Sequence, residues 1–309
     1  MTTPSGDRVT LVEVGPRDGF QGIGPFIPTA TKIDFVRRLA AAGLGRIEAG
    51  SFVSPSAVPQ LGDATEVLAA SRSIPGLRAQ FLVPNARWGA TALTAGVDFL
   101  AFVVSVSEAH NRSNVRRHPL ESVAEYIRLI EVCPPGVDIR LNLATAFDCP
   151  FDGRVAESAV LDLLGPLVAV RSTAEICLCD TTGRATPDHV AGLFDRVRAA
   201  FPAVERWAFH AHDTYGLGLA DVHAAWTRGV RVFDAAFAGL GGCPFAPGAT
   251  GNVATEDVVF LFERMGISTG VDLDELLSIA CDGTVIPGAA AGGRVRAALT
   301  GSRSPSCGS

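Results

Sequence analysis

The segment Ala208-Phe-His-Ala-His-Asp-Thr-Tyr-Gly216 carries two histidines, His210 and His212, at the end of an apolar run. Side chains alternate along a β-strand, so we expect both imidazoles to leave the same face of one strand, side by side. Two neutral imidazoles held in this way suit a divalent metal, provided that other segments supply oxygen ligands. The alternative interpretation is a pair of hydrogen-bonded histidines near the rim of a barrel, and the rest of the chain must separate the two.

This segment is the seventh of eight apolar, β-branched runs that alternate with longer stretches of helical period. Eight strand–helix alternations over about 260 residues predict one parallel (β/α)8 TIM barrel of the α/β class, with a doubly wound open sheet as the alternative. We expect one catalytic domain, 1–309, with the barrel over about 9–270 and a short C-terminal helical extension over 271–309. The expected strands are Val9–Val14, Arg46–Glu48, Arg78–Val83, Val97–Val104, Asp138–Leu143, Ala174–Leu178, Arg206–Ala211 and Arg231–Phe237.

The composition narrows the class of protein. The 309 residues are 48% hydrophobic, enough for a large core, and the net charge of −6 argues against general nucleic-acid binding. No apolar stretch is long enough to cross a membrane, and Met1–Thr10 has no apolar leader, so we expect a cytoplasmic protein without a membrane partner. Seven cysteines without a Cys-x-x-Cys pair indicate reduced thiols, and we expect Cys177 and Cys179 to pack in the core.

Polar side chains recur where the predicted strands end. Arg17 and Asp18 follow the first strand, Glu48 ends the second, and Asp180 follows the sixth. The eighth strand leads into a glycine-rich segment, 238–252. In barrels of this type the reactive groups gather at the carboxyl ends of the strands, and charged side chains from so many strands indicate a shared task.

Five segments of the sequence resemble the hydroxymethylglutaryl-CoA lyases, members of a larger group of metal-dependent barrels that make or break Claisen and aldol bonds. The likeness runs from about Val9 to Gly270, and its last segment, which contains Cys243, is more specific than the histidine pair that the wider group shares. The five segments are Val12-Glu-Val-Gly-Pro-Arg-Asp-Gly-Phe-Gln21, Ile47-Glu-Ala-Gly-Ser-Phe-Val-Ser-Pro55, Val58-Pro-Gln-Leu-Gly-Asp63, His210-Ala-His-Asp-Thr-Tyr-Gly216 and Gly239-Leu-Gly-Gly-Cys-Pro-Phe-Ala-Pro-Gly-Ala-Thr-Gly-Asn-Val-Ala-Thr-Glu-Asp257.

The resemblance implies that Asp18, His210, His212 and Asn252 are the ligands of a divalent metal, Mg²⁺ or Mn²⁺. Two oxygens and two nitrogens suit that choice, because they leave open positions for substrate and need no soft thiolate. For Asp18 and Asn252 the alternative is a turn residue at a strand end.

The resemblance further implies cleavage of (S)-3-hydroxy-3-methylglutaryl-CoA to acetyl-CoA and acetoacetate, an acyl-CoA reaction of leucine catabolism and ketone body formation. The reaction removes the tertiary hydroxyl proton, breaks the C2–C3 bond and holds a thioester enolate until it is protonated. A metal bound to that hydroxyl lowers its pKa. We also expect a homodimer.

The remaining groups take roles in this chemistry. Arg17 is expected to stabilise the enolate oxygen, and Cys243 to protonate the enolate carbon from a loop that closes over the site. His210 is also a candidate base, and Glu48 and Asp180 are expected to orient the ligands or relay the proton. The alternatives are a surface ion pair for Arg17, a small buried hydrophobe for Cys243, and turn or ion-pair residues for the two acids.

Three positions depart from the family pattern. Gly50 stands where many relatives have threonine, Asp148 stands where glycine is common, and the segment 105–117 differs from the animal enzymes. The last two put the acyl substrate in doubt more than the reaction. The alternatives are therefore a lyase for another 3-hydroxy-3-alkylglutaryl-CoA, a condensing synthase on an α-keto acid, and a barrel that only binds.

Overall fold

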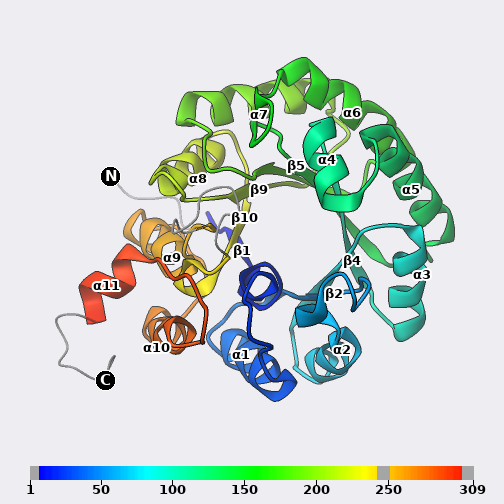
Figure 1. Cartoon of the computed structure of the whole chain (residues 1–309). Coiled ribbons are helices and arrows are strands. Elements are labelled where there is room, and N and C mark those ends of the chain that lie inside the picture. The colour runs from blue at the N-terminus through cyan, green and yellow to red at the C-terminus, as the bar shows by residue number, and fades with distance from the viewer. Residues whose placement is uncertain (1–6, 242–250, 301–309) are drawn as a thin grey trace.

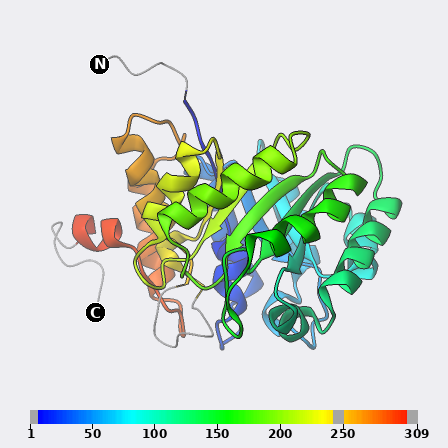
Figure 2. The ribbon, with the colours of Figure 1, turned by 90° about the horizontal axis from the view of Figure 1, so that it is seen from above.

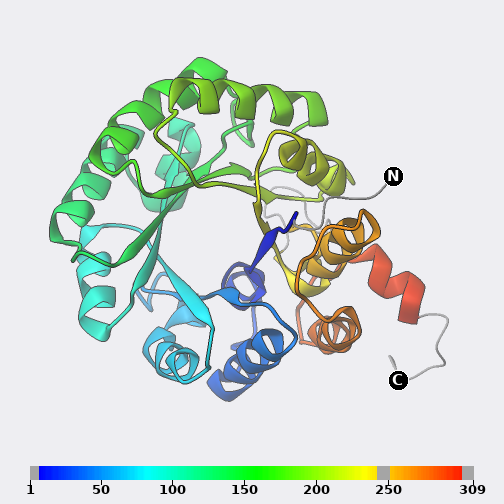
Figure 3. The same cartoon turned by 180° about the vertical axis from the view of Figure 1, so that it is seen from behind.

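The structure, a computed structural model, describes residues 7–241 and 251–300. Eight parallel strands form a closed barrel with helices around its outside (Figures 1 and 3). The predicted (β/α)8 barrel is therefore confirmed, and the open sheet is excluded. In their order around the barrel wall, the strands are β1 (Thr10–Glu13), β2 (Arg46–Ser51), β3 (Arg78–Val83), β4 (Phe99–Ser105), β5 (Asp138–Ala144), β8 (Glu175–Asp180), β9 (Trp207–Ala211) and β10 (Val232–Ala235), which pairs with β1.

One long helix follows each strand and packs against the outside of the barrel (Figure 1). These helices are α1 (Thr29–Ala41), α2 (Ala64–Arg72), α3 (Ala86–Ala95), α5 (Pro119–Val132), α6 (Glu157–Val170), α7 (Pro187–Ala200), α8 (Gly218–Thr227) and α9 (Thr255–Arg264).

Additional elements occupy three places in the chain. Helix α4 (Glu108–Val115) precedes α5, and a hairpin of β6 (Asp148–Cys149) and β7 (Gly153–Arg154) follows β5. The expected C-terminal extension contains α10 (Leu273–Thr284) and α11 (Arg294–Thr300). Helix α10 packs against α1 and α9, whereas α11 lies farther out, beyond them (Figures 1 and 2).

Strand alternation determines which side chains face the helices. In β5, Ile139, Leu141 and Leu143 are buried in the main hydrophobic core, while Arg140 and Asn142 take the opposite face. The period of two therefore explains both the apolar run that reveals the strand and the polar residues within it.

The interior of the barrel contains charged side chains, where branched apolar residues are usual. Arg46 of β2 contacts Glu175 of β8 through two hydrogen bonds of 2.7 Å, and Arg140 of β5 donates to Asp234 of β10 at 2.6 Å. Neither pair lies on neighbouring strands, so both contacts cross the interior. The barrel is thus built around a polar centre.

The cysteines of the described residues are reduced, as expected. Cys177 and Cys179 are buried and form a small apolar cluster with Ala208, separate from the main core, which confirms their packing role. Cys243 and Cys307 lie outside the described residues. Within residues 7–241 and 251–300, none of the helices combines the length and the apolar character that crossing a bilayer requires.

Candidate metal and active site

Asp18, His210 and His212 form a cluster in which the potential ligand atoms all lie within 4.8 Å of one another. The two imidazoles leave the end of β9 in the same direction, with ring centroids 5.1 Å apart and planes tilted by 52°. The structure therefore brings together the three ionisable groups that the sequence assigns to a metal, although they come from β1 and β9.

Asp18 reaches the cluster from a short π-helical turn, η1 (Gly15–Gly19), directly after β1. Its backbone N–H donates to the Val14 carbonyl at 2.7 Å, which fixes the turn. Its carboxylate accepts one hydrogen bond from Arg17 Nη1 at 2.5 Å and another from Asn252 Nδ2 at 2.8 Å. Because an ionised carboxylate offers about four acceptor positions, both oxygens keep capacity for a cation.

Asn252 joins the cluster because its segment runs along the end of β9. The Asp213 N–H donates to the Gly251 carbonyl at 2.8 Å, and the Val253 N–H to the Ala211 carbonyl at 3.1 Å. These bonds place Asn252 opposite His212, with only 1% of its surface exposed. The amide is thus a buried member of the cluster as well as part of a turn.

Two buried polar atoms of this cluster, His212 Nδ1 and Asn252 Oδ1, have no hydrogen-bond partner among the described residues. Leaving such an atom unpaired costs about 1–3 kcal/mol, so two unpaired buried atoms on neighbouring residues of one cluster indicate a ligand. Imidazole nitrogens, a carboxylate and an amide oxygen are donors that Mg²⁺ and Mn²⁺ accept. The residues present therefore fit a divalent cation.

Asp234, whose contribution to the site was not predicted from the sequence, contacts His210 on the side away from the cluster. Asp234 Oδ2 lies 3.0 Å from His210 Nδ1, and the two residues are register partners on β10 and β9. This contact leaves Nε2 of His210 for the cluster. The signal in the sequence was a single acid inside the apolar run Arg231–Phe237.

Arg17 is buried, with 9% of its surface exposed, so it is not a surface ion pair. Its Nε donates to Glu48 Oε1, and its Nη1 to Asp18. Gln80 Nε2 holds the other oxygen of Glu48 at 2.7 Å. Glu48, which we expected to orient the ligands or relay a proton, contacts Arg17 and Gln80 and thereby orients the guanidinium.

The structure does not bring Asp180 to the cluster. The hydrogen bonds of its carboxylate go to its own loop, from the backbone N–H groups of Gly183 at 3.0 Å and Ala185 at 3.1 Å and from the Thr182 hydroxyl at 3.3 Å. This geometry corresponds to the turn-residue alternative. Cys243, the expected proton donor, lies outside the described residues.

The ionisation of the cluster follows from its neighbours. Burial opposes the charge of Asp18, but Arg17 and the two imidazoles hold the pKa of its carboxyl well below the ordinary value. Burial likewise opposes a charged His210, yet Asp234 and Asp18 raise its pKa to about 9. Burial and His210 together lower the pKa of His212 to about 3. Without a metal, one imidazole is therefore charged, and a cation would replace that proton.

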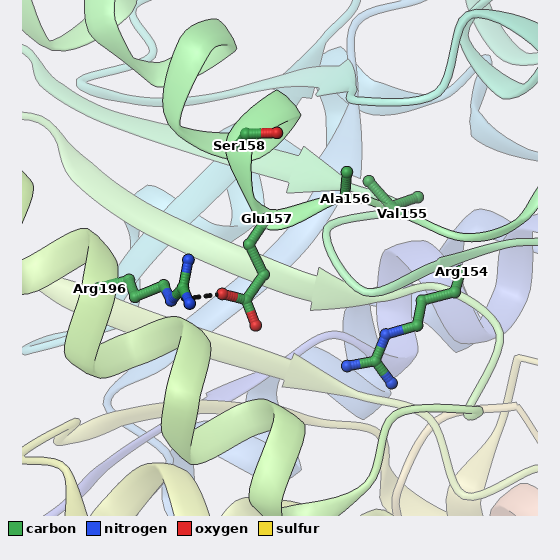
Figure 4. Close-up of a pocket in the computed structure, with 6 residues that line it drawn as sticks. All are labelled: Arg154, Val155, Ala156, Glu157, Ser158 and Arg196. Carbon is green, nitrogen blue, oxygen red and sulfur yellow. Dashed lines mark ion pairs between the residues drawn. The ribbon is translucent and has the colours of Figure 1, made fainter.

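A separate hollow of about 560 Å³ opens near the start of α6 (Figure 4). Glu157 and Arg196 form an ion pair there, 2.7 Å between Oε2 and Nε, and Arg154 lies on the other side of Glu157 from Arg196 (Figure 4). No residue of the metal cluster lines this hollow, so we exclude it from the candidate site. Its lining is Arg154, Val155, Ala156, Glu157, Ser158 and Arg196.

Comparison with known proteins agrees with this geometry. Residues 8–282 match the family model described as HMGL-like. The chain belongs to the HMGL-like family. A relative from this family, the (R)-citramalyl-CoA lyase of Chloroflexus aurantiacus, is 39% identical over 283 residues, covering 88% of this chain and 89% of that protein. The 3-hydroxy-3-isohexenylglutaryl-CoA/hydroxy-methylglutaryl-CoA lyase of Pseudomonas aeruginosa is 40% identical over 293 residues, covering 94% and 97%.

Solved structures of HMGL-like relatives share the fold over nearly the whole chain. An HMG-CoA lyase from Brucella melitensis superposes with a TM-score of 0.84 and 42% identity, covering 89% of this chain and 97% of that one. An HMG-CoA lyase from Acinetobacter baumannii, in complex with coenzyme A and 3-methylmalate, gives a TM-score of 0.89 and 38% identity, covering 99% and 98%. The family indicated by the five sequence segments is thus confirmed.

Proposed function

We propose that this protein is a carbon–carbon lyase that cleaves (S)-3-hydroxy-3-methylglutaryl-CoA to acetyl-CoA and acetoacetate. The observation that carries the proposal is the convergence of Asp18, His210, His212 and Asn252 beside a buried Arg17. This is a set of cation ligands next to a fixed positive charge. Membership of the HMGL-like family and relatives that act on acyl-CoA thioesters support it.

The four converging residues would hold the divalent cation, Mg²⁺ or Mn²⁺. When bound, that cation lowers the pKa of the substrate's tertiary hydroxyl and so favours loss of its proton. His210 cannot hold the cation and act as the base at once, because Asp234 engages its Nδ1 and the cation would occupy the lone pair of Nε2.

Arg17 provides the positive charge for the enolate. Loss of the hydroxyl proton and cleavage of the C2–C3 bond turn C3 into the ketone of acetoacetate and leave the bond electrons on the thioester as an enolate. Glu48 and Asp18 hold the guanidinium before substrate arrives, so stabilising the enolate oxygen requires little reorganisation. Cys243 would then donate its proton to C2 and so form the methyl group of acetyl-CoA.

A panel of thioesters tests the substrate. The purified protein is incubated with Mg²⁺ and hydroxymethylglutaryl-CoA, a longer 3-hydroxy-3-alkylglutaryl-CoA or citramalyl-CoA, and the released keto acid and acetyl-CoA are quantified. We expect the highest kcat/KM with hydroxymethylglutaryl-CoA. Turnover of another thioester without measurable acetoacetate would transfer the proposal to that substrate, and condensation of acetyl-CoA with an α-keto acid alone would contradict it.

Replacing the thiol tests the proton donor. Cys243→Ser is expected to lower kcat roughly 10²- to 10⁴-fold, because an alcohol is a much weaker acid than a thiol. Cys133→Ser, at the end of the outer helix α5, is the matched control and should leave kcat unchanged. Near-normal turnover in Cys243→Ser would exclude it as the donor.

The proposal also includes a homodimer, a cytoplasmic location and a place in leucine catabolism and ketone body formation. These remain predictions. Sedimentation of the purified protein measures the first of them directly.

A further inference from the structure

Asp234 lies behind the metal cluster and contributes no ligand atom to it. Its side chain is buried, and Oδ2 lies 3.0 Å from His210 Nδ1. The same oxygen accepts a hydrogen bond from Arg140 Nη2 at 2.6 Å. One carboxylate oxygen thus contacts both a proposed metal ligand and a guanidinium.

Arg140 connects Asp234 to the other side of the barrel. The Arg140 side chain is fully buried, and its Nη1 lies 3.1 Å from Glu175 Oε1. Glu175 accepts two further hydrogen bonds of 2.7 Å from Arg46. Arg46 also donates to Gln80 Oε1, at 3.1 and 2.9 Å.

Gln80 completes the connection, because its Nε2 donates to Glu48, the residue that holds Arg17. A continuous set of buried polar contacts therefore runs from His210 to Arg17 through the barrel interior. We call it the interior chain. Its members are Asp234, Arg140, Glu175, Arg46, Gln80 and Glu48.

Filling the barrel interior with these charged and polar side chains carries a cost in free energy. Taking paired charges out of water carries a desolvation penalty that their attraction often does no more than offset, and apolar side chains of similar volume give equal or greater stability. The interior chain begins at His210 and ends at Arg17, the two groups whose orientation the proposed chemistry requires. Its position indicates a role in that orientation.

We propose that Asp234 is the positioning residue of His210. The other members of the interior chain hold Asp234 in place and link it to Arg17. The inference rests on the proposed function in that the cluster binds a divalent cation. The carboxylate accepts the Nδ1 proton, so the imidazole keeps the tautomer and ring orientation that present Nε2 to the cluster. Without that acceptor the ring is free to flip or to carry its proton on Nε2.

Mn²⁺ binding to the metal-free protein tests the proposal without any substrate. The protein is stripped with a chelator and titrated with Mn²⁺ while the electron paramagnetic resonance signal of the free ion is recorded. Asp234→Asn should raise the dissociation constant roughly 10- to 100-fold. Asp221→Asn makes the same chemical change at another buried carboxylate, one on α8 outside the cluster, and should leave the constant within about twofold of wild type.

A double-mutant cycle separates positioning from a general structural effect. If Asp234 acts through the imidazole, adding Asp234→Asn to His210→Ala should weaken Mn²⁺ binding no further. An equal loss in the wild-type and His210→Ala backgrounds would overturn the proposal, as would wild-type affinity in a folded Asp234→Asn protein.

A second variant covers the case in which Asp234→Asn does not fold. Asp234→Glu keeps the negative charge beside Arg140 but moves the acceptor away from Nδ1, so a folded protein with weaker Mn²⁺ binding supports the proposal. Wild-type affinity in Asp234→Glu would contradict it. Wild-type protein that binds no Mn²⁺ would overturn the metal site of the proposed function together with this inference, whereas normal Mn²⁺ binding that ignores Asp234 would overturn this inference alone.

Discussion

Two regions of this molecule bury acidic side chains, and the pKa values of these carboxyl groups shift in opposite directions in the two regions. In the barrel interior and at the strand ends beside it, burial opposes the charges of Asp234, Glu175 and Asp18, yet facing arginines keep the pKa of each below its ordinary value. Outside the barrel wall, burial raises the pKa of Asp221 on α8 and of Glu256 on α9 to about 8. The same amino acids are thus ions in one region and neutral acids in the other at neutral pH.

The difference follows from the partners. Asp221 is fully buried, neither of its oxygens has a hydrogen-bond partner among the described residues, and the charges that act on it are the acids Asp180, Asp188 and Asp213. An arginine facing a carboxylate offsets the cost of burying its charge, and a second acid increases that cost. The interior carboxylates that face arginines therefore keep the negative charge that a cation site requires, whereas Asp221 does not.

A large effect on turnover is expected from Arg17, which faces Asp18 and Glu48 in the charged region. Arg17→Lys should lower kcat roughly 10²- to 10³-fold and change KM much less, because the enolate charge exists mainly near the transition state. A lysine ammonium lacks the planar fork that spans both carboxylates. Steady-state kinetics at saturating Mg²⁺ measure this, with Arg37→Lys at an exposed position of α1 as the control, and a near-normal kcat would assign Arg17 a purely structural role.

The next expected effect is a pH dependence of cation binding, because a cation must displace a proton from His210. Below the pKa of His210, about 9, the metal-free imidazole is charged, so cation binding releases its proton and becomes weaker as pH falls. Asp18 stays ionised over this range and adds no slope. Apparent Mn²⁺ affinity should therefore fall about tenfold per pH unit between roughly pH 8 and 6. Titration calorimetry in two buffers of different ionisation enthalpy counts the released protons, and a pH-independent affinity would show that His210 is neutral in the free site.

The smallest effect is expected in the uncharged region. The pKa of Asp221 is about 8 in the folded protein, against an ordinary value of 3.8. As pH rises between these values, the unfolded chain loses this proton while the folded protein keeps it. The stability of the wild-type protein therefore falls over this pH range. Asp221→Asn does not ionise, so it should change stability little near pH 4 and increase the free energy of unfolding by roughly 1–3 kcal/mol at pH 8. Urea unfolding at both pH values measures this, and an equal gain at both would mean that Asp221 is not protonated in the folded state.

The two regions also differ in how far the sequence predicts them. Strand periodicity predicts the barrel and the strand-end residues Asp18 and His212, because apolar runs and the polar groups after them are local patterns. Asp234 and Arg140 sit inside apolar runs, and their partnership depends on contacts across the barrel between strands 94 residues apart. Local patterns carry no signal for such contacts.

Asp180 shows a second limit of prediction from the sequence, because a residue can end a strand without facing the barrel interior. It follows Cys177 and Cys179, which face the barrel interior, so alternation directs its side chain to the opposite face of β8. Its position at a strand end made it a candidate for the site, but the face of β8 that it occupies directs its side chain away from the cluster. Assigning a face to each strand-end residue would have separated it from His210 and His212, which lie at the end of β9 on its interior face.

Metal occupancy and turnover, measured in the same samples, test most directly whether the cluster binds the cation that cleavage requires. Protein stripped of metal is loaded with increasing Mn²⁺, and bound ion per chain and acetoacetate formation from hydroxymethylglutaryl-CoA are determined for wild type, Asp18→Ala and His212→Ala. We expect one bound ion per wild-type chain, turnover that rises in proportion to occupancy, and loss of both in the two variants. Full turnover by metal-free protein, or unchanged binding without Asp18 or His212, would contradict this expectation.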